Sequence, residues 1–285
     1  MPDMVELLER FNLEEGMSEG PMADIVFYKS SGPLSRTPRL YPPGICILAQ
    51  GSKTGHLGGR RFSYDAENYL ITSMTLPFEC EVHATTEKPL LGFHVNIDMP
   101  LLGELIHQIG EQQFPQKTIE ALGPAPFEPA FQQAAIQLLQ CLHSPMEIRI
   151  MGKQRIRELY FRVLCGPQAP ALYELFNQNS HFARVAHIVA NLHQNYAGKL
   201  VVDELAAQAH MSPSSFHRAF RDVTSDTPIQ YLKKLRLNKA RDFMMHEAMT
   251  VYMAADKVGY ESVSQFSREF KRYFGQSPSH MVRSR

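Results

Sequence analysis

The sequence of 285 residues lacks several features that would define a class of protein, and net charge is the first of them. It contains 29 Lys and Arg residues against 29 Asp and Glu residues, so the formal net charge is zero. Cysteine is scarce: Cys46, Cys80, Cys141 and Cys165 form no CxxC pair and no Cys/His metal pattern. The sequence therefore excludes a disulfide-stapled scaffold and a structural zinc module.

Long apolar runs are absent as well, because none approaches the roughly 18 residues that a membrane-spanning helix needs. The first residues are acidic and lack the basic and apolar regions of a signal peptide. We therefore expect a cytoplasmic protein with reduced thiols and no membrane contact. Hydrophobic residues make up 44% of the chain, which is enough for folded cores, and the length suggests two domains.

The zero net charge hides an asymmetry between the two parts of the chain. Residues 181–285 hold 15 basic and 9 acidic side chains, a balance of +6, and residues 1–180 hold the compensating −6. A basic C-terminal part indicates a polyanionic partner.

The N-terminal half reads as short strands followed by helices. Apolar and polar residues alternate with period two in the stretches around Cys80 and Val95, as in half-buried strands. Gly58-Gly59 lies between two such runs and is a two-residue hairpin signal. Several short strands separated by turns predict a small β-barrel or sandwich. Beyond Asp98 the apolar period becomes helical, and helices are expected at about 101–109, 131–142 and 147–165.

Residues 181–285 read as wholly helical. The expected domains are 1–176 and 181–285, joined by a short polar linker at 177–180. Helices are expected at about 182–195, 202–209, 213–223, 228–247, 250–258, 262–274 and 278–283. The expected fold class is therefore α+β, with a β-barrel and helices in the first domain and only helices in the second.

An internal repeat is the strongest signal in the sequence. SSFHRAFR at 214–221 aligns with SQFSREFK at 264–271, at an offset of 50 residues. Each segment follows a short helix and a tight turn, so the sequence predicts two helix-turn-helix units, at about 202–223 and 250–274.

The two repeated helices should each present one apolar and one polar face. At 100° per residue, Phe216 and Phe220 share an inner face, and Arg218 points outward. A helix with an aromatic inner edge and an Arg-, Ser- and His-bearing outer edge fits the major groove, where Arg grips guanine by two hydrogen bonds. The residues expected to contact DNA are Ser214, His217, Arg218, Arg221, Ser264, Ser267, Arg268 and Lys271.

The helix expected at 228–247 is about 30 Å long, close to the roughly 34 Å between adjacent major grooves on one side of B-DNA. It can therefore hold two recognition helices in successive grooves. A basic run lies along it, and its charges either meet phosphates or form a solvated face. The run consists of Lys233, Lys234, Arg236, Lys239 and Arg241.

With these motifs, residues 181–285 resemble the AraC/XylS-type DNA-binding domain, and the run VGYESVSQFSREFKRYFGQSPSHMVR at 258–283 carries most of the resemblance. Residues 40–98 resemble the companion N-terminal domain of AraC-type regulators. The resemblance implies a cupin-like β-barrel followed by helices, and a bacterial transcription regulator whose first half senses an effector or dimerises. The sequence departs from the family at His210-Met211, where a small and an apolar residue are usual, and at Ala254, where Ile is usual.

The first half offers no metal or catalytic signature. Cupin metal sites use an HxH pair, whereas His56, His83 and His94 stand alone. We therefore expect no metal, no cofactor and no catalytic residue. Its apolar strand faces predict a barrel that holds a small organic effector. The residues expected to line that site are Phe78, Cys80, Val82, Phe93 and Val95.

The expected function is sequence-specific regulation of transcription, with promoter or operator DNA as partner and with the protein located at the nucleoid when bound. RNA polymerase and a second copy of the chain are further possible partners. Three alternatives stay open: a cupin-type enzyme fused to a DNA-binding module, a barrel that is filled by side chains and only dimerises, and a sequence-neutral architectural or RNA-binding protein.

Overall fold

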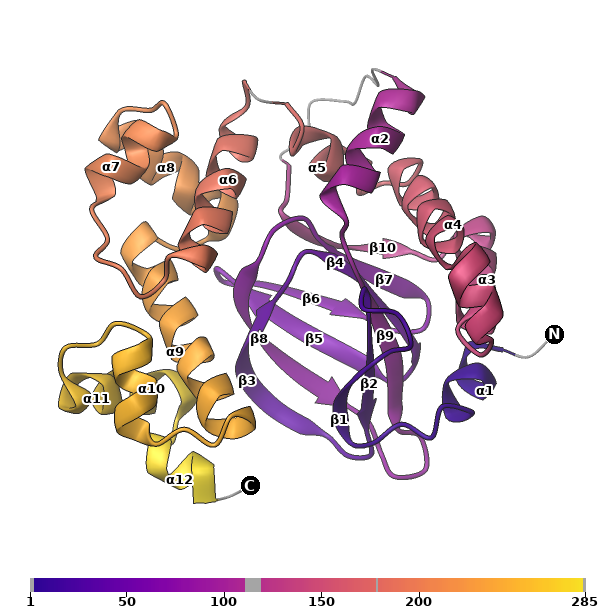
Figure 1. The fold of residues 1–285 in the computed structure, drawn as a ribbon, viewed down its shortest axis with the longest axis horizontal. Coiled ribbons are helices and arrows are strands. Elements are labelled where there is room, and N and C mark those ends of the chain that lie inside the picture. The colour runs from indigo at the N-terminus through magenta and orange to yellow at the C-terminus, as the bar shows by residue number, and fades with distance from the viewer. Residues whose placement is uncertain (1–2, 111–118, 178, 284–285) are drawn as a thin grey trace.

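The computed structural model describes residues 3–110, 119–177 and 179–283. The strand-rich half consists of two antiparallel sheets that form a barrel (Figure 1). One sheet has the order β1-β2-β9-β4-β7-β10 and the other the order β3-β8-β5-β6. The strands are β1 (Gly16–Glu19), β2 (Ile25–Ser30), β3 (Leu34–Tyr41), β4 (Gly44–Gln50), β5 (Ser52–Leu57), β6 (Arg60–Tyr64), β7 (Asn68–Thr72), β8 (Leu76–His83), β9 (Leu90–Asn96) and β10 (Leu122–Pro126).

The hairpin expected at Gly58-Gly59 joins β5 to β6. Both glycines have positive φ, 56° and 81°, as a type I′ turn requires. The turn sets the antiparallel register in which Leu57 pairs with Arg60.

Each sheet of the barrel has an inner and an outer face, and both faces of the larger sheet are buried. The inner face contributes Tyr28, Cys46 and Leu70 to the barrel interior. The outer face contributes Phe27 and Phe93 to a second core beneath four helices. These are α1 (Met4–Glu9), α2 (Met99–Ile109), α3 (Pro129–Cys141) and α4 (Pro145–Leu164).

The second half is helical and is built along one long helix, α9. In Figure 1, α7 and α8 lie near one end of α9, and α10 and α11 lie near the other. Each pair is a short helix followed by a longer one, so the chain contains the two expected helix-turn-helix units. The remaining helices are α5 (Ala169–Glu174), α6 (His181–Gln194), α7 (Val202–Gln208), α8 (Pro213–Thr224), α9 (Pro228–His246), α10 (Val251–Lys257), α11 (Val263–Phe274) and α12 (Pro278–Arg283).

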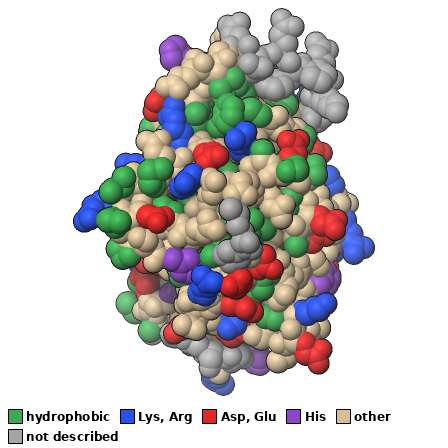
Figure 2. Space-filling model, turned by 90° about the vertical axis from the view of Figure 1, so that its right-hand side faces the viewer, with side chains coloured by type: hydrophobic (Ala, Val, Ile, Leu, Met, Phe, Trp, Pro, Cys, Tyr) green, Lys and Arg blue, Asp and Glu red, His purple; other side chains and the backbone are tan. Residues whose placement is uncertain are grey.

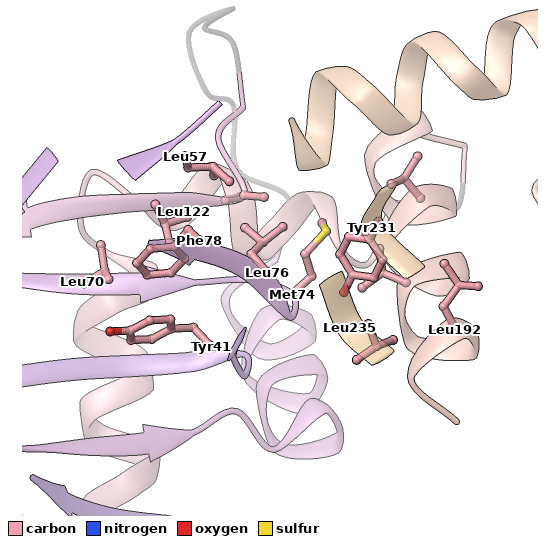
Figure 3. Packing of buried hydrophobic residues seen from close by; sticks show 14 of the residues in the cluster. Tyr41, Leu57, Leu70, Met74, Leu76, Phe78, Leu122, Leu192, Tyr231 and Leu235 are labelled. Carbon is pink, nitrogen blue, oxygen red and sulfur yellow. The ribbon is translucent and has the colours of Figure 1, made fainter. Parts of the chain in front are cut away.

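The first helix-turn-helix unit shares a continuous hydrophobic core with the barrel. Figure 3 shows Tyr231 and Leu235 of α9 packed beside Met74 and Leu76 at the end of the barrel. The Tyr231 hydroxyl donates a hydrogen bond to the carbonyl oxygen of Thr75 at 2.8 Å. That hydroxyl has one proton, so the Nε2–H of His193 donates the 3.1 Å bond that joins this ring to Tyr231.

The second unit has a core of its own, in which Ala254, Phe266 and Phe270 are fully buried. Its link to the barrel is polar, because Arg241 of α9 donates a hydrogen bond to the carbonyl oxygen of Pro38 in β3 at 2.9 Å. The two units are therefore attached to the barrel in different ways.

The structure confirms the expected fold class. The helices of the second half begin and end within about two residues of the expected bounds. Sequence reasoning missed α1, α5 and three strands, β1, β3 and β10. The expected linker lies between α5 and α6, and its residue 178 lies outside the described residues. Within the described ranges, no helix is long and apolar enough to cross a membrane.

Candidate nucleic-acid interface

Both recognition helices begin in the same way. The hydroxyl of Ser212 accepts a hydrogen bond from the backbone N–H of Ser215 and caps α8. The hydroxyl of Ser262 accepts the equivalent bond from Gln265 and caps α11. A capping serine satisfies an N–H that the first helical turn leaves free, which fixes the position at which each helix starts. The two helices therefore present corresponding residues at corresponding positions.

The inner faces of α8 and α11 are aromatic and dry. Phe216 and Phe220 of α8, and Phe266 and Phe270 of α11, have no exposed surface. Within each pair the ring centroids lie 5.5 Å and 5.4 Å apart. These phenylalanines fix the rotation of each helix about its axis, and so fix which side chains face outward.

All eight residues predicted to contact DNA lie on the outer part of the two helices. Seven of them are exposed, and Ser267 is half-buried. Arg218, Arg221, Arg268 and Lys271 form no ion pair within the described part of the chain. Four uncompensated cations on two matching helices form a surface suited to a polyanion. That these residues contact DNA stays a prediction.

The basic residues of α9 have partners within the protein. Lys233 pairs with Glu269 at 2.9 Å, and Lys234 with Asp226 at 2.7 Å. The Lys239 ammonium lies 5.7 Å from the centroid of the Tyr196 ring.

Arg236 and Arg241 of α9 bind backbone carbonyl groups. Arg236 donates hydrogen bonds to the carbonyl oxygens of Tyr196 and Gly259, at 2.7 Å and 3.1 Å. Arg241 bonds to Pro38 of the barrel. The five cations therefore join elements of the protein to α9 instead of forming a free basic face.

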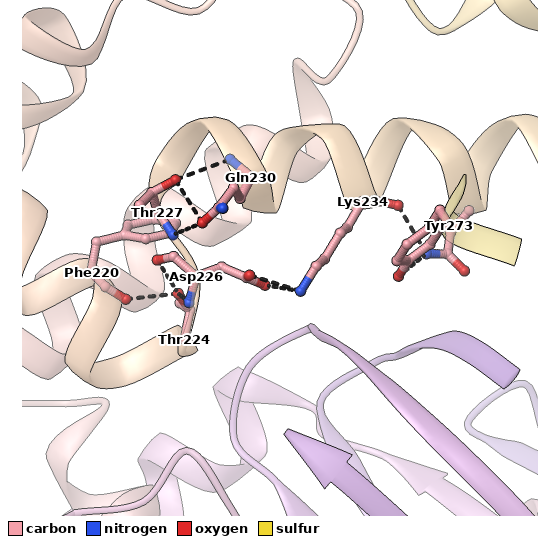
Figure 4. A network of polar contacts seen from close by, with 8 residues as sticks. Phe220, Thr224, Asp226, Thr227, Gln230, Lys234 and Tyr273 are labelled. Carbon is pink, nitrogen blue, oxygen red and sulfur yellow. Dashed lines mark hydrogen bonds and ion pairs between the residues drawn. The ribbon is translucent and has the colours of Figure 1, made fainter. Parts of the chain in front are cut away.

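A polar network fixes the joint between α8 and α9. Figure 4 shows the Thr227 hydroxyl and the Gln230 side chain in a reciprocal capping box at the start of α9. Beside it, both carboxylate oxygens of Asp226 accept hydrogen bonds from Lys234, at 2.7 Å and 2.8 Å. The orientation of the first recognition helix relative to α9 is thereby set by an exposed capping box and a half-buried ion pair.

Sequence reasoning missed two residues of this surface. Gln265 and Arg272 line an open hollow beside Arg268 on the second recognition helix. Both lie outside the positions at which the repeat conserves a residue type, so the comparison of the two repeats did not select them. Their positions on the helical wheel, on the side of α11 away from Phe266 and Phe270, would have identified both residues.

The residues predicted to line an effector site are not brought together. Phe78, Cys80 and Val82 of β8 face the barrel interior. Phe93 and Val95 of β9 face the opposite side of the sheet, against the helices. Because β9 is a central strand covered on both faces, both of its alternating sets are buried, and alternation alone does not identify the inner one. The inward face of β9 carries Leu90, Gly92 and His94, since Leu90 belongs to the barrel core and the register partners of Gly92 and His94 are Leu48 and Cys46.

Burial governs the ionisation of the polar groups in the barrel. It raises the pKa of the Cys46 thiol and the pKa values of the Tyr41 and Tyr64 hydroxyls. It lowers the pKa of His94 to about 4, so this imidazole is neutral at pH 7. Within the described residues, no three His, Cys, Asp or Glu side chains are grouped to hold a metal ion.

Comparison with known families agrees with this geometry. The model of the AraC-type transcriptional regulator N-terminus matches residues 21–171, just over half of the chain, and a helix-turn-helix domain model matches residues 205–284. The chain belongs to the AraC-type transcriptional regulators. The resemblance noted from the motifs is thereby confirmed.

Individual relatives of this AraC-type chain match over shorter stretches. The transcriptional activator RhaS of Klebsiella pneumoniae is 33% identical over 148 residues, which are 50% of this chain and 52% of RhaS. The RCS-specific activator RclR of Escherichia coli is 46% identical over 77 residues, 27% of each chain. The chain thus spans about half or less of the length of these relatives.

Solved structures show the same fold over nearly the whole chain. An apo variant of ToxT from Vibrio cholerae has a TM-score of 0.60 at 10% identity, covering 94% of this chain and 98% of that one. Wild-type ToxT with a bound unsaturated fatty acid has a TM-score of 0.58 at 10% identity, covering 90% and 94%. At this identity the likeness concerns the fold alone.

Proposed function

We propose that this chain is a sequence-specific DNA-binding transcription regulator that reads two adjacent major-groove segments with α8 and α11. The observation that carries the proposal is the matched pair Arg218 and Arg268. Both are exposed, both lack an ion-pair partner among the described residues, and both occupy the same position relative to a buried Phe pair. An arginine in this position can bond to guanine O6 and N7 in the major groove.

The length of α9 supports the same proposal. Its 19 residues correspond to about 28 Å at 1.5 Å per residue. Adjacent grooves on one side of B-DNA lie about 34 Å apart, so one helix of this length suits two recognition helices that bind successive grooves. The internal partners of its basic residues keep α9 rigidly attached to both units.

The test uses the full chain and a DNA duplex that the wild-type protein selects from a random library. Arg218→Ala and Arg268→Ala should each weaken binding of this duplex by about 5- to 150-fold, the equivalent of about 1–3 kcal/mol. Folding should be unchanged, because both side chains point away from the buried phenylalanines. Arg10→Ala, which changes an exposed arginine at the end of α1, is the control and should bind as wild type does.

A competition at raised salt separates this proposal from sequence-neutral binding to DNA or RNA. Non-specific binding depends on phosphate contacts and falls steeply with salt, whereas base contacts retain a preference for the selected duplex. If unrelated DNA competes as well as the selected duplex does, or if both arginine variants bind like wild type, the chain is not the reader proposed.

The barrel would serve as the effector domain of this regulator. One solved relative in fold, ToxT, holds an unsaturated fatty acid, which supports a small organic effector here. A ligand of this kind would act by binding more tightly to one of two conformations, and would shift the population by no more than that difference in affinity. A regulator of promoters would also meet RNA polymerase and would lie at the nucleoid while bound.

Homodimerisation through α4 is the second role proposed for this half. Met146 and Ile150 of α4 are 61% and 65% exposed. Figure 2 shows the molecule from the side on which α3 and α4 lie, where hydrophobic side chains are found among acidic and basic ones. A catalytic role is not proposed, since the curated relatives described above are transcriptional activators.

A further inference from the structure

The inner face of the barrel carries two cations, Arg39 of β3 and Lys53 of β5. Arg39 is the register partner of Phe78, and Lys53 is the register partner of both Val82 and Tyr64. Partners in register share one face of a sheet, and these three partners belong to the core of the barrel. Both cationic side chains are therefore directed toward the interior, where Lys53 is 6% exposed and Arg39 is half-buried.

Neither cation has an anionic partner within the described residues. The Lys53 ammonium lies 4.3 Å from the centroid of the Tyr28 ring, and neither it nor the Arg39 guanidinium forms an ion pair or a side-chain hydrogen bond there. The carboxylates of the adjacent strand β8 are on the outer face. Glu79 pairs with Arg36, and Glu81 with His56.

The groups around the two cations are hydroxyls and aromatic rings. Tyr41 lies two residues beyond Arg39 on the same face of β3, and Tyr28 belongs to the same barrel core. Burial raises the pKa of both phenols. The Tyr64 hydroxyl lies beside the Cys46 thiol and has no nitrogen or oxygen partner among the described residues. The Tyr41 hydroxyl has the Cys80 thiol as hydrogen-bond partner and the Tyr64 hydroxyl has the Cys46 thiol. A thiol is a weak acceptor, so an anion would compete well for these hydroxyl protons.

The apolar part of the same interior is aromatic. The Tyr41 ring stacks on Phe78 with centroids 4.1 Å apart, and Phe62 meets Phe78 edge-on at 5.6 Å. Such rings offer an apolar surface against which the apolar part of a ligand could pack. The sequence has no phosphate-binding Gly loop, so a carboxylate is favoured over a phosphate ester as the anionic group.

We propose that the interior of the barrel binds a small organic carboxylate, whose anionic group lies between Arg39 and Lys53 and whose apolar part lies against the barrel aromatics. The proposal rests on the effector role given to this half above and assigns the chemical class of its ligand. Its physical reason is charge balance: a buried cation without a counter-ion costs stability, and a carboxylate would remove that cost when it binds.

The first experiment needs no knowledge of the natural ligand. Thermal unfolding of the full-length, ligand-free protein is compared for wild type, Lys53→Met and Arg36→Met. Lys53→Met should unfold at a higher temperature than wild type, because it removes an unpaired buried charge and keeps the length of the side chain. Arg36→Met removes a paired, exposed charge from β3 and should not raise the unfolding temperature. A lower unfolding temperature for Lys53→Met would mean that the ammonium is a structural group, and would overturn the proposal.

The second experiment measures binding of acetate, hexanoate, benzoate and phenylacetate by calorimetry, each beside its neutral amide. At least one acid should bind while its amide does not. Lys53→Met and Arg39→Met should each weaken that binding at least 10-fold, and Arg36→Met should leave it unchanged. Binding of the amides as tightly as the acids, or of no acid at all, would overturn the proposal.

DNA binding is recorded in parallel, so that the two proposals can fail separately. Lys53→Met should retain wild-type affinity for the selected duplex in the absence of ligand. If Lys53→Met fails to fold, Arg39→Met and the charge-retaining Lys53→Arg supply the comparison, and Lys53→Arg should keep most of the affinity for the acid. Loss of affinity in Lys53→Arg equal to that in Arg39→Met would argue against a charge-based site.

Discussion

His94 illustrates how a single buried residue can make the whole fold sensitive to pH. It lies on the inner face of β9 with 1% of its surface exposed, and burial lowers its pKa to about 4. His193, which joins α6 to Tyr231, is shifted in the same direction by the same cause. An unfolded chain protonates histidine near pH 6.5, so between pH 6.5 and about 4 the unfolded state binds protons that the folded state does not.

We therefore predict that stability falls as the pH is lowered from 7 to 4.5. At full effect His94 alone accounts for about 3 kcal/mol, since each pKa unit corresponds to about 1.4 kcal/mol. Replacing His94 by Gln, which does not titrate, should flatten this dependence by its share, even if stability at pH 7 is lower. Urea unfolding at pH 7.0, 6.0 and 5.0 measures the slope. A variant with the slope of wild type would show that His94 does not stay neutral in the fold.

At the scale of helices and strands, the accuracy of sequence reasoning followed the strength of local signals. The helices α6, α8, α9, α10 and α11 begin at capping Ser or Thr residues, and α8 and α9 have Pro in the first turn. These signals are local. The missed strands β1, β3 and β10 are all at sheet edges, and β3 and β10 contain proline. Edge strands are partly solvated and tolerate proline, so they lack the alternation that identifies central strands.

The residues of the candidate sites were also predictable only where a local signal identified them. The outward residues of α8 and α11 were predictable because a helix with two buried Phe residues has only one possible outer face. The inward residues of the barrel were not predictable from the sequence. Arg39 and Lys53 face the interior only because their strands pair with distant strands and the sheets close into a barrel. Side-chain alternation gives two faces for a strand, and the pairing of distant strands decides which is inside.

The turns of the two helix-turn-helix units differ in the type of residue that has a positive φ angle. Both turns contain a residue with positive φ, His210 at 52° in the first and Gly259 at 82° in the second. A Cβ atom on Gly259 would lie 2.2 Å from the carbonyl oxygen of Ala197, which is backbone and cannot move away easily. Gly275, at the end of α11, has φ 77° but open space around it.

Gly259→Ala should therefore destabilise the protein more than Gly275→Ala. Gly275→Ala bears only the cost of a left-handed alanine, about 1–2 kcal/mol. Gly259→Ala adds a collision with backbone, of the order of 1–3 kcal/mol more. Chemical unfolding of the two variants gives the comparison, with Gly275→Ala as the matched control. Equal effects would indicate that the segment at Ala197 shifts freely, in spite of the hydrogen bonds that Arg236 makes there.

At the scale of the whole molecule, the barrel and the first helix-turn-helix unit share one hydrophobic core, whereas the second unit has its own core. The packing around Tyr231 joins the barrel to α6, α8 and α9, since this ring meets Phe220 edge-on at 5.6 Å and its hydroxyl binds Thr75. The hairpin tip at Gly58 also approaches Ser225, at the end of α8, closely. A change in the barrel would therefore reach α8 through the shared core, and would reach α11 through α9 and the contact of α11 with β3, outside that core.

Met74→Ala tests this division, because Met74 lies in the buried cluster beside Tyr231 (Figure 3) and is 3% exposed. Loss of this side chain should cost about 2–5 kcal/mol in the shared core. In native-state hydrogen exchange, the amides of α8 should then exchange faster by the same free energy, while those of α11, which open with the second core, should keep their wild-type protection. Met4→Ala is the control, since Met4, the first residue of α1, is also buried but packs in the core on the other side of the larger sheet. This change should loosen α1 and leave both recognition helices protected. Equal loss of protection in α8 and α11 after Met74→Ala would mean that the two units open together, and that an effector in the barrel would act on both recognition helices at once.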